Sequence, residues 1–144
     1  MATFVIPGEP KGKGRPRFSA RTTKDGRAFV TTRTPQETVI YENLVRLEYE
    51  AQCGVRFPDD AQMVALITAV YAIPKSASKR RRAQMLEGRV LPRKKPDVDN
   101  IAKCILDSLN GIAYRDDSQV VECTVKKVYG DTPCVMVCMS AGGE

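Results

Sequence analysis

Apolar residues recur at helical spacing in two segments of the chain. The clearer segment opens at Pro96-Asp97 and stops at Gly111. Its apolar positions fall at i, i+3, i+4, i+7, i+8 and i+11, namely Val98, Ile101, Ala102, Ile105, Leu106 and Leu109. The second segment opens at Thr34-Pro35-Gln36-Glu37, with Thr34 as N-cap, and runs to Cys53. Its expected core-facing stripe is Ile40, Leu44, Leu47 and Ala51. Both patterns predict amphipathic helices packed on a core.

Apolar runs bounded by turn residues predict the β-strands. The run from Met63 to Ile73 is apolar on both alternating faces, which is typical of a strand inside a sheet. A turn at Asp25-Gly26 predicts a hairpin between strands at 18–22 and 28–32. The other strands are expected at 2–6, 120–129 and 134–139. A short helix over 79–87 is expected to follow a capping serine, either Ser76 or Ser78.

This order of elements predicts an α+β fold, a mixed β-sheet with helices packed on it. The length of 144 residues suits a single domain over 1–144. The last strand is apolar on both faces, with Cys134, Met136 and Cys138 on one and Val135, Val137 and Met139 on the other. Because an apolar strand at the edge of a sheet needs cover, we expect a homodimer.

The composition is that of an ordinary globular protein. Hydrophobic residues make up 42% and charged residues 28%, which excludes wholesale disorder. No apolar run reaches the ~20 residues of a spanning helix, so no membrane association is expected. Residues 1–10 lack the charged and apolar regions of a secretory signal. We therefore expect a soluble, cytoplasmic protein.

Histidine is absent, and the five cysteines form no Cys-x-x-Cys pair. A structural zinc site therefore lacks its usual ligand spacing. Every nucleophile that depends on a histidine base is excluded as well, and the thiols are interpreted as reduced core residues. Any chemistry must depend on Asp, Glu, Lys, Tyr or a bound metal.

Basic residues are concentrated in two stretches. Lys and Arg number 23 against 17 Asp and Glu, and eight of the 23 lie within 11–33 and nine within 75–95. A solvated face explains one charge run, but two dense stretches indicate a surface for a polyanion, first of all nucleic acid. The four bases at 79–82 surround their predicted helix, which suits a bulky anion. The residues expected to contact DNA are Lys11, Lys13, Arg15, Arg17, Lys79, Arg80, Arg81, Arg82, Lys94 and Lys95.

Four carboxylates flank the clearer predicted helix, at Asp97, Asp99, Asp116 and Asp117. A structural role accounts for each one alone. Asp97 is a good N-cap, Asp99 can pair with Lys103 one turn along, and Asp-Asp is common in turns. Together they form a self-repelling cluster in a cationic protein, and a bound cation is the simplest rationale for it.

Mg²⁺ suits such a cluster because it prefers a few carboxylates, water and phosphate oxygens. An ion held by Asp97, Asp99 and Asp117 can activate water and offset charge on a scissile phosphate. Lys103 places a cation at the same site. This interpretation is a nuclease active site without histidine.

The motifs resemble those of the RusA family of Holliday junction resolvases. The resemblance rests on Lys95-Pro96-Asp97-x-Asp99-Asn100-Ile101-x-Lys103, on Asp107-x-Leu109-Asn110-Gly111, and on Asp116-Asp117-x-Gln119-Val120. Pro7-Gly8-x-Pro10-Lys11 and Gly14-Arg15-Pro16-Arg17 are similar to the opening of phage and prophage members. The motifs occur in order along most of the chain.

The resemblance implies an endodeoxyribonuclease that works as a homodimer and makes paired, symmetric cuts across four-way DNA junctions. It implies that Asp97, Asp99 and Asp117 bind the catalytic Mg²⁺, for which Mn²⁺ can substitute, and that Lys103 is the essential lysine. Asp116 and Gln119 match the motif and are expected to support the site without binding the ion.

Other classes explain the sequence less completely. A non-catalytic basic nucleic-acid-binding protein accounts for the charge but not for the carboxylates, and metal-dependent turnover discriminates the two. A glycosyltransferase can use Asp-x-Asp, but this chain has no predicted β-α-β unit for a nucleotide. An EF-hand fails because the loop lacks its further ligands and glycine. A purely structural or interaction protein stays open as a hypothesis.

Overall fold

The computed structural model describes residues 1–14, 17–33 and 35–142. Four strands form the central sheet in the order β1, β6, β4, β5. Their bounds are β1 Ala2–Pro7, β4 Met63–Ala72, β5 Val120–Gly130 and β6 Cys134–Ala141. β6 pairs antiparallel with both β1 and β4, whereas β4 and β5 pair in parallel. The mixed sheet and the interior position of β4 are thereby confirmed.

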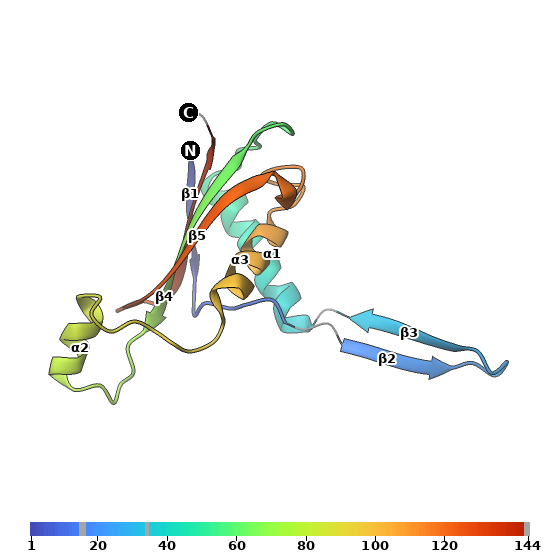
Figure 1. Cartoon of the computed structure of the whole chain (residues 1–144), viewed down its shortest axis with the longest axis horizontal. Coiled ribbons are helices and arrows are strands. Elements are labelled where there is room, and N and C mark those ends of the chain that lie inside the picture. Colours follow the sequence, from blue (N-terminus) through green and yellow to red (C-terminus); the bar gives the residue numbers. More distant parts are fainter. Residues whose placement is uncertain (15–16, 34, 143–144) are drawn as a thin grey trace.

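Two helices, α1 (Gln36–Gln52) and α3 (Val98–Ser108), cover one face of this sheet (Figure 1). α2 (Lys79–Leu86) lies beyond the end of β4, next to the end of β5 (Figure 1). β2 (Arg17–Thr22) and β3 (Ala28–Arg33) form an antiparallel hairpin, here called the arm, that projects away from the sheet (Figure 1). The predicted α+β class is therefore confirmed. In the described ranges, no helix is long and apolar enough to cross a membrane.

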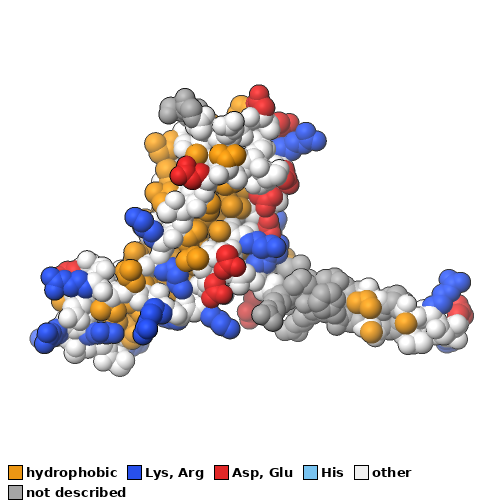
Figure 2. Space-filling model, in the orientation of Figure 1, with side chains coloured by type: hydrophobic (Ala, Val, Ile, Leu, Met, Phe, Trp, Pro, Cys, Tyr) orange, Lys and Arg blue, Asp and Glu red, His pale blue; other side chains and the backbone are white. Residues whose placement is uncertain are grey.

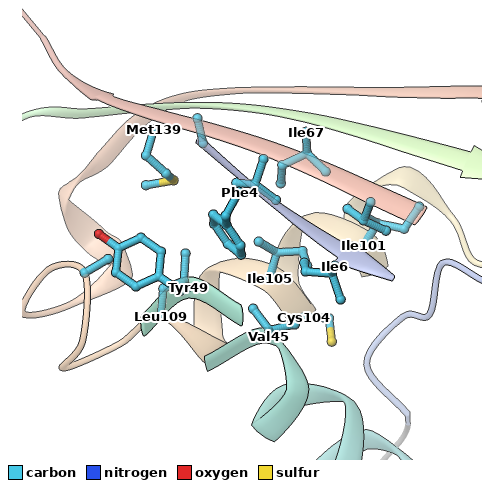
Figure 3. Packing of buried hydrophobic residues seen from close by; sticks show 14 of the residues in the cluster. Phe4, Ile6, Val45, Tyr49, Ile67, Ile101, Cys104, Ile105, Leu109 and Met139 are labelled. Carbon is cyan, nitrogen blue, oxygen red and sulfur yellow. The ribbon is translucent and has the colours of Figure 1, made fainter. Parts of the chain in front are cut away.

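The core lies between the sheet and its two helices (Figure 3). Along β1 the residues alternate between buried and exposed, which turns Phe4 and Ile6 inward. Phe4 meets Tyr49 of α1 edge-on, with ring centroids 5.2 Å apart. From α3 the fully buried side chains include Ile101 and Ile105, as predicted. This packing holds both ends of α3 at defined places against the sheet.

The buried face of α1 differs from the predicted one. Ile40 and Leu47, expected in the core, are 60% and 64% exposed. Ala51 is also exposed, and Leu44 is only half-buried. The helix instead buries Thr38, Tyr41, Glu42, Val45 and Tyr49. Because both stripes have helical spacing, periodicity does not distinguish them, and two large tyrosines bury the greater area.

The helix boundaries agree partly with the capping predictions. Ser78 is the N-cap of α2, and its Oγ accepts a hydrogen bond from the Arg81 backbone at 3.1 Å. The N-cap position of α1 belongs to Pro35, without a side-chain cap, and the predicted cap Thr34 lies outside the described residues. Gly111, which follows α3, has a φ of +77°, a left-handed conformation that favours glycine.

The last strand is not at the edge that the sequence suggested. β6 lies between β1 and β4, so its edge position, one reason for expecting a homodimer, is wrong. Strand order is set by long-range pairing, which the apolar pattern of one strand does not encode. The inner face of β6 is buried as expected of a core strand. On the outer face of the sheet, Val5, Leu66 and Met136 are 40%, 44% and 41% exposed.

Candidate active site

Asp97 and Asp99 lie at the start of α3. Asp97 occupies the N-cap with extended backbone, φ −68° and ψ 156°, yet its side chain makes no capping hydrogen bond. Asp99 lies in the first turn, and both residues are exposed. Lys103 is exposed one turn further along the same face, and among the ion pairs of the described residues none joins it to Asp99. The capping and pairing roles therefore do not occupy these side chains.

A second acidic group lies at the C-terminal end of α3, whose last turn contains Asp107. Asp107, eight residues after Asp99, is hydrogen-bonded to Asp117 and to Lys13. The Lys13 Nζ lies 2.6 Å from Asp107 Oδ2, and the two side chains are only 26% and 19% exposed. The carboxyl groups of Asp107 and Asp117 thus lie near two lysines, Lys13 and Lys103.

The two carboxyl groups in contact have opposite pKa shifts. Burial acts to raise the pKa of Asp107, but the hydrogen bonds with Lys13 and Asp117 outweigh it and leave that pKa below its usual range. The hydrogen bond with Asp107, together with partial burial, raises the pKa of Asp117. Of the two, Asp107 is the anion and Asp117 is the group that retains a proton more readily.

A capped turn sets the position of Asp117. Asp117 opens the short helical turn η1 (Asp117–Gln119), and Asp116 Oδ2 accepts a hydrogen bond from the Ser118 backbone at 3.0 Å. Gln119 Oε1 accepts from the backbones of Arg115 and Asp116, at 2.9 and 3.2 Å. Its Nε2 donates to carbonyls at Pro58 and Ala61. The contacts of Asp116 and Gln119 hold the turn, and their supporting role in an ion site stays a prediction.

The glycine-rich segment Lys11–Gly14, here called the strap, threads between the starts of α1 and α3. A Cβ on Gly12 would lie 2.8 Å from the Pro96 Cβ, and one on Gly14 would lie 2.7 Å from the Thr38 Oγ1. The Gly14 backbone N–H donates to that same Thr38 oxygen at 2.9 Å. Glycine is required here because the backbone approaches both helices closely, and the strap carries Lys13 to Asp107.

A tyrosine on β4 organises the chain before Asp97. The Tyr71 hydroxyl donates to the Pro96 carbonyl at 3.3 Å. The ammonium groups of Lys94 and Lys127 lie 5.5 and 5.4 Å from the centre of its ring. Lys127 also donates to the Lys94 carbonyl. Two cations are thereby held close to the start of α3.

Further bases surround α2. Lys and Arg side chains gather at the α2 end of the molecule (Figure 2), and residues 79–82 are all exposed. Arg82 pairs with Asp131 at 2.6 Å, which engages one of them. Lys11, Lys94 and Lys95 are exposed too. Arg15 and the side chain of Arg17 lie outside the part of the chain that the structure describes, and DNA contact by the whole set stays a prediction.

The donor chemistry of the site suits a divalent cation. Among the described residues, no three Asp, Glu or Cys side chains are close enough to hold a metal ion as a group. Asp97 and Asp99 therefore do not stand assembled with Asp117. However, carboxylate oxygens are the ligands that Mg²⁺ prefers, and two of them meet at Asp107 and Asp117. A cation relieves the repulsion between two neighbouring carboxylates, so the chemistry of these two residues fits an ion of this kind.

The sequence patterns predict no role for Asp107, Lys127 or Tyr71. Asp107 stands within a quoted motif, and its helical spacing from Asp99 and Lys103 was a usable signal. Its partner Lys13 is 94 residues away, and no local pattern reveals such a contact. Lys127 stands on the strand expected at 120–129, for which the sequence predicts no functional role.

An acidic site within a basic α+β domain is compatible with a nuclease that acts on the DNA backbone. Comparison with known families is consistent with this class: the family model described as endodeoxyribonuclease RusA matches residues 7–140. The chain belongs to the RusA endodeoxyribonuclease family. It is also 36% identical over 140 residues to a Bacillus subtilis (strain 168) protein named "Uncharacterized protein YqaN", covering 93% of this chain and 92% of that protein.

Proposed function

We propose that this protein is a Mg²⁺-dependent endonuclease that resolves four-way DNA junctions by paired, symmetric nicks. Family membership supports nuclease activity on branched DNA. The observation that carries the proposal is the contact between the Asp107 and Asp117 carboxyl groups, beside Lys13 and Lys103, in a chain of net charge +6. Such a pair is costly in a protein without a cation to bind, and its basic surroundings suit the DNA backbone.

In this mechanism Asp97, Asp99 and Asp117 hold the ion. When bound, Mg²⁺ supplies Lewis acidity toward water and toward the scissile phosphate. Lys103, exposed on the same helical face as Asp99, donates to a phosphate oxygen and offsets the charge that develops during hydrolysis. Mn²⁺ has similar oxygen preferences and substitutes for Mg²⁺.

The bases orient the substrate. Lys94 and Lys127, held at the Tyr71 ring, bind a backbone phosphate near the start of α3. The exposed bases of α2 extend this contact along the DNA away from the site. Because phosphate contacts do not read the base sequence, they position a junction by its shape.

Paired cutting requires two copies of the site. A homodimer provides them, and the outer face of the sheet, with Val5, Leu66 and Met136 each about two-fifths exposed, is an apolar surface that a second copy can cover. A two-fold axis then relates the two acidic sites as it relates the arms of a junction.

The test is incubation of the purified protein with a synthetic four-way junction or a matched duplex, in Mg²⁺ or EDTA. We expect symmetric nicks in the junction alone, and none in EDTA. Lys103→Ala is expected to fold and to bind the junction but to cut it at least ~100-fold more slowly, because alanine favours the helix while the site loses its cation. Junction binding without nicking in any divalent cation would instead support the non-catalytic binding protein.

A further inference from the structure

The ion pair between Lys13 and Asp107 differs from the other ion pairs of the described residues. Its side chains are 26% and 19% exposed, whereas those of the other pairs are 48% to 75% exposed. It joins residues 94 positions apart. Partial shielding from water makes this pair stronger than an exposed one, and neither the motif nor the proposed mechanism requires it.

The strap leaves Lys13 little freedom to move. Gly12, on one side of it, has no space for a Cβ beside Pro96, and Gly14, on the other, is hydrogen-bonded to Thr38. The backbone on each side of Lys13 is therefore in contact with α3 or α1. Lys13 reaches Asp107 from a fixed base, and Asp107 is in turn held where it contacts Asp117.

The ammonium group of Lys13 remains charged. The hydrogen bond with Asp107 outweighs the effect of burial and raises the pKa of Lys13, and the charge of Glu42 on α1 acts in the same direction. A permanent positive charge thus lies beside the carboxylate pair that faces the candidate metal site.

We propose, building on the function proposed above, that Lys13 is a positioning residue of the metal site. It holds Asp107 against Asp117, and its charge weakens the attraction of this pair for a divalent cation. The strap also joins this contact to the arm, which begins three residues after Gly14. Lys13 thereby sets both how tightly the ion binds and how well the Asp117 carboxylate is placed.

Two opposite effects follow from removing the charge of Lys13. The site becomes more negative, so Mg²⁺ binds about three- to tenfold more tightly, a modest factor because the pair is partly exposed. Asp107 loses its anchor, so Asp117 is less well placed and cleavage at saturating Mg²⁺ slows by about tenfold. A residue with only a structural role would not tighten ion binding.

The experiment compares wild type with Lys13→Met, Lys13→Arg and the control Lys11→Met. Met keeps most of the side-chain length, Arg keeps the charge, and Lys11→Met removes an exposed charge from the same strap. Melting of the DNA-free protein is followed during a Mg²⁺ titration, and junction cleavage is measured over the same concentrations. We expect a lower Mg²⁺ midpoint and a lower maximal rate for Lys13→Met. For Lys13→Arg and Lys11→Met we expect the wild-type Mg²⁺ midpoint in the melting of the DNA-free protein.

A wild-type Mg²⁺ midpoint for Lys13→Met, or a melting curve of the wild type that does not respond to Mg²⁺, overturns the inference. If Lys13→Met fails to fold, Asp107→Asn serves in its place, since it keeps a hydrogen-bonding side chain. It removes a negative charge from the site and is therefore expected to raise the Mg²⁺ midpoint. An unchanged Mg²⁺ midpoint then refutes the inference. Wild-type protein that binds Mg²⁺ as described but does not cut a junction refutes the proposed function and leaves the role of Lys13 supported.

Discussion

Asp117→Asn separates the stability of the site from its activity. In the metal-free protein, Asp117 has a raised pKa because its carboxyl group meets Asp107. A raised carboxyl pKa means that the folded state loses stability as the pH rises from the unfolded value to the folded one. Above that window Asp117 is ionised against an anionic neighbour. An asparagine removes this charge, and its amide N–H can still donate to Asp107.

The expected magnitude follows from the hydrogen bond and the exposure. A hydrogen bond to a charged group is worth about 1.5–3 kcal/mol in general, and partial exposure reduces it to about 1 kcal/mol here. For a chain of this length, about 1 kcal/mol corresponds to a shift of roughly 3 °C in Tm. The variant is therefore expected to melt higher than wild type in EDTA at pH 8.

The assay is thermal unfolding at pH 8 and at a pH close to the ordinary aspartate pKa of about 4, with and without Mg²⁺. The advantage of Asp117→Asn is expected to shrink at the lower pH, where the raised pKa leaves Asp117 of the wild type less charged than at pH 8. At pH 8, Mg²⁺ should raise the Tm of wild type more than that of the variant, and junction cleavage by the variant should fall by orders of magnitude.

Asp97→Asn is the matched control. The Asp97 side chain makes no capping hydrogen bond, and Asn is an equally good N-cap, so this variant is expected to melt like wild type in EDTA at both pH values while losing cleavage. Equal melting of Asp117→Asn and wild type at pH 8 would refute the argument from carboxylate repulsion. Full cleavage by either variant would return its aspartate to a structural role.

Three further outcomes are expected. Gly12→Ala should lower the Tm by several degrees, because its Cβ would lie 2.8 Å from the Pro96 Cβ. Gly26→Ala, at the open turn of the arm, meets no neighbouring atom, so any loss of Tm should come from backbone strain alone. Changing Arg80, Arg81 and Arg82 to Ala should flatten the dependence of log affinity on log salt by about 0.9 per lost phosphate contact, and an unchanged slope in a junction gel-shift titration would make them a solvated face. Light scattering at micromolar concentration should give the mass of a dimer, and Met136→Asp should give a monomer that keeps its fold, since this side chain is on the outer face of the sheet and 41% exposed.

The elements were predictable where one periodicity was present. α3 has a single apolar stripe, so Ile101, Ile105 and Leu109 could be placed in the core from the sequence. α1 has two stripes of helical spacing, and the choice between Leu47 and Tyr49 depended on the shape of the sheet beneath it. The predicted edge position of β6 was wrong for a related reason, because strand order depends on pairing between segments that are far apart in the chain.

The candidate site divides in the same way. Asp97, Asp99 and Asp117 could be proposed as ligands because their motifs are local, and both ends of α3 are close in sequence. The contact of Lys13 with Asp107 brings together two segments that share no motif, so the sequence placed Lys13 only in a general basic surface. The charge composition predicted nucleic acid as the class of partner. It did not predict which lysine contacts the acidic pair Asp107 and Asp117.

The parallel pairing of β4 with β5 has an evolutionary consequence. One crossover, residues 73–119, carries α2, α3 and the turn with Asp117, so the acidic motifs and the second basic stretch occupy a single interruption of the sheet. Within that crossover α2 makes an excursion that ends before the acidic helix begins. Insertions or deletions around α2 are therefore expected to change the DNA contacts proposed for α2 while the strand register and the acidic helix stay unchanged.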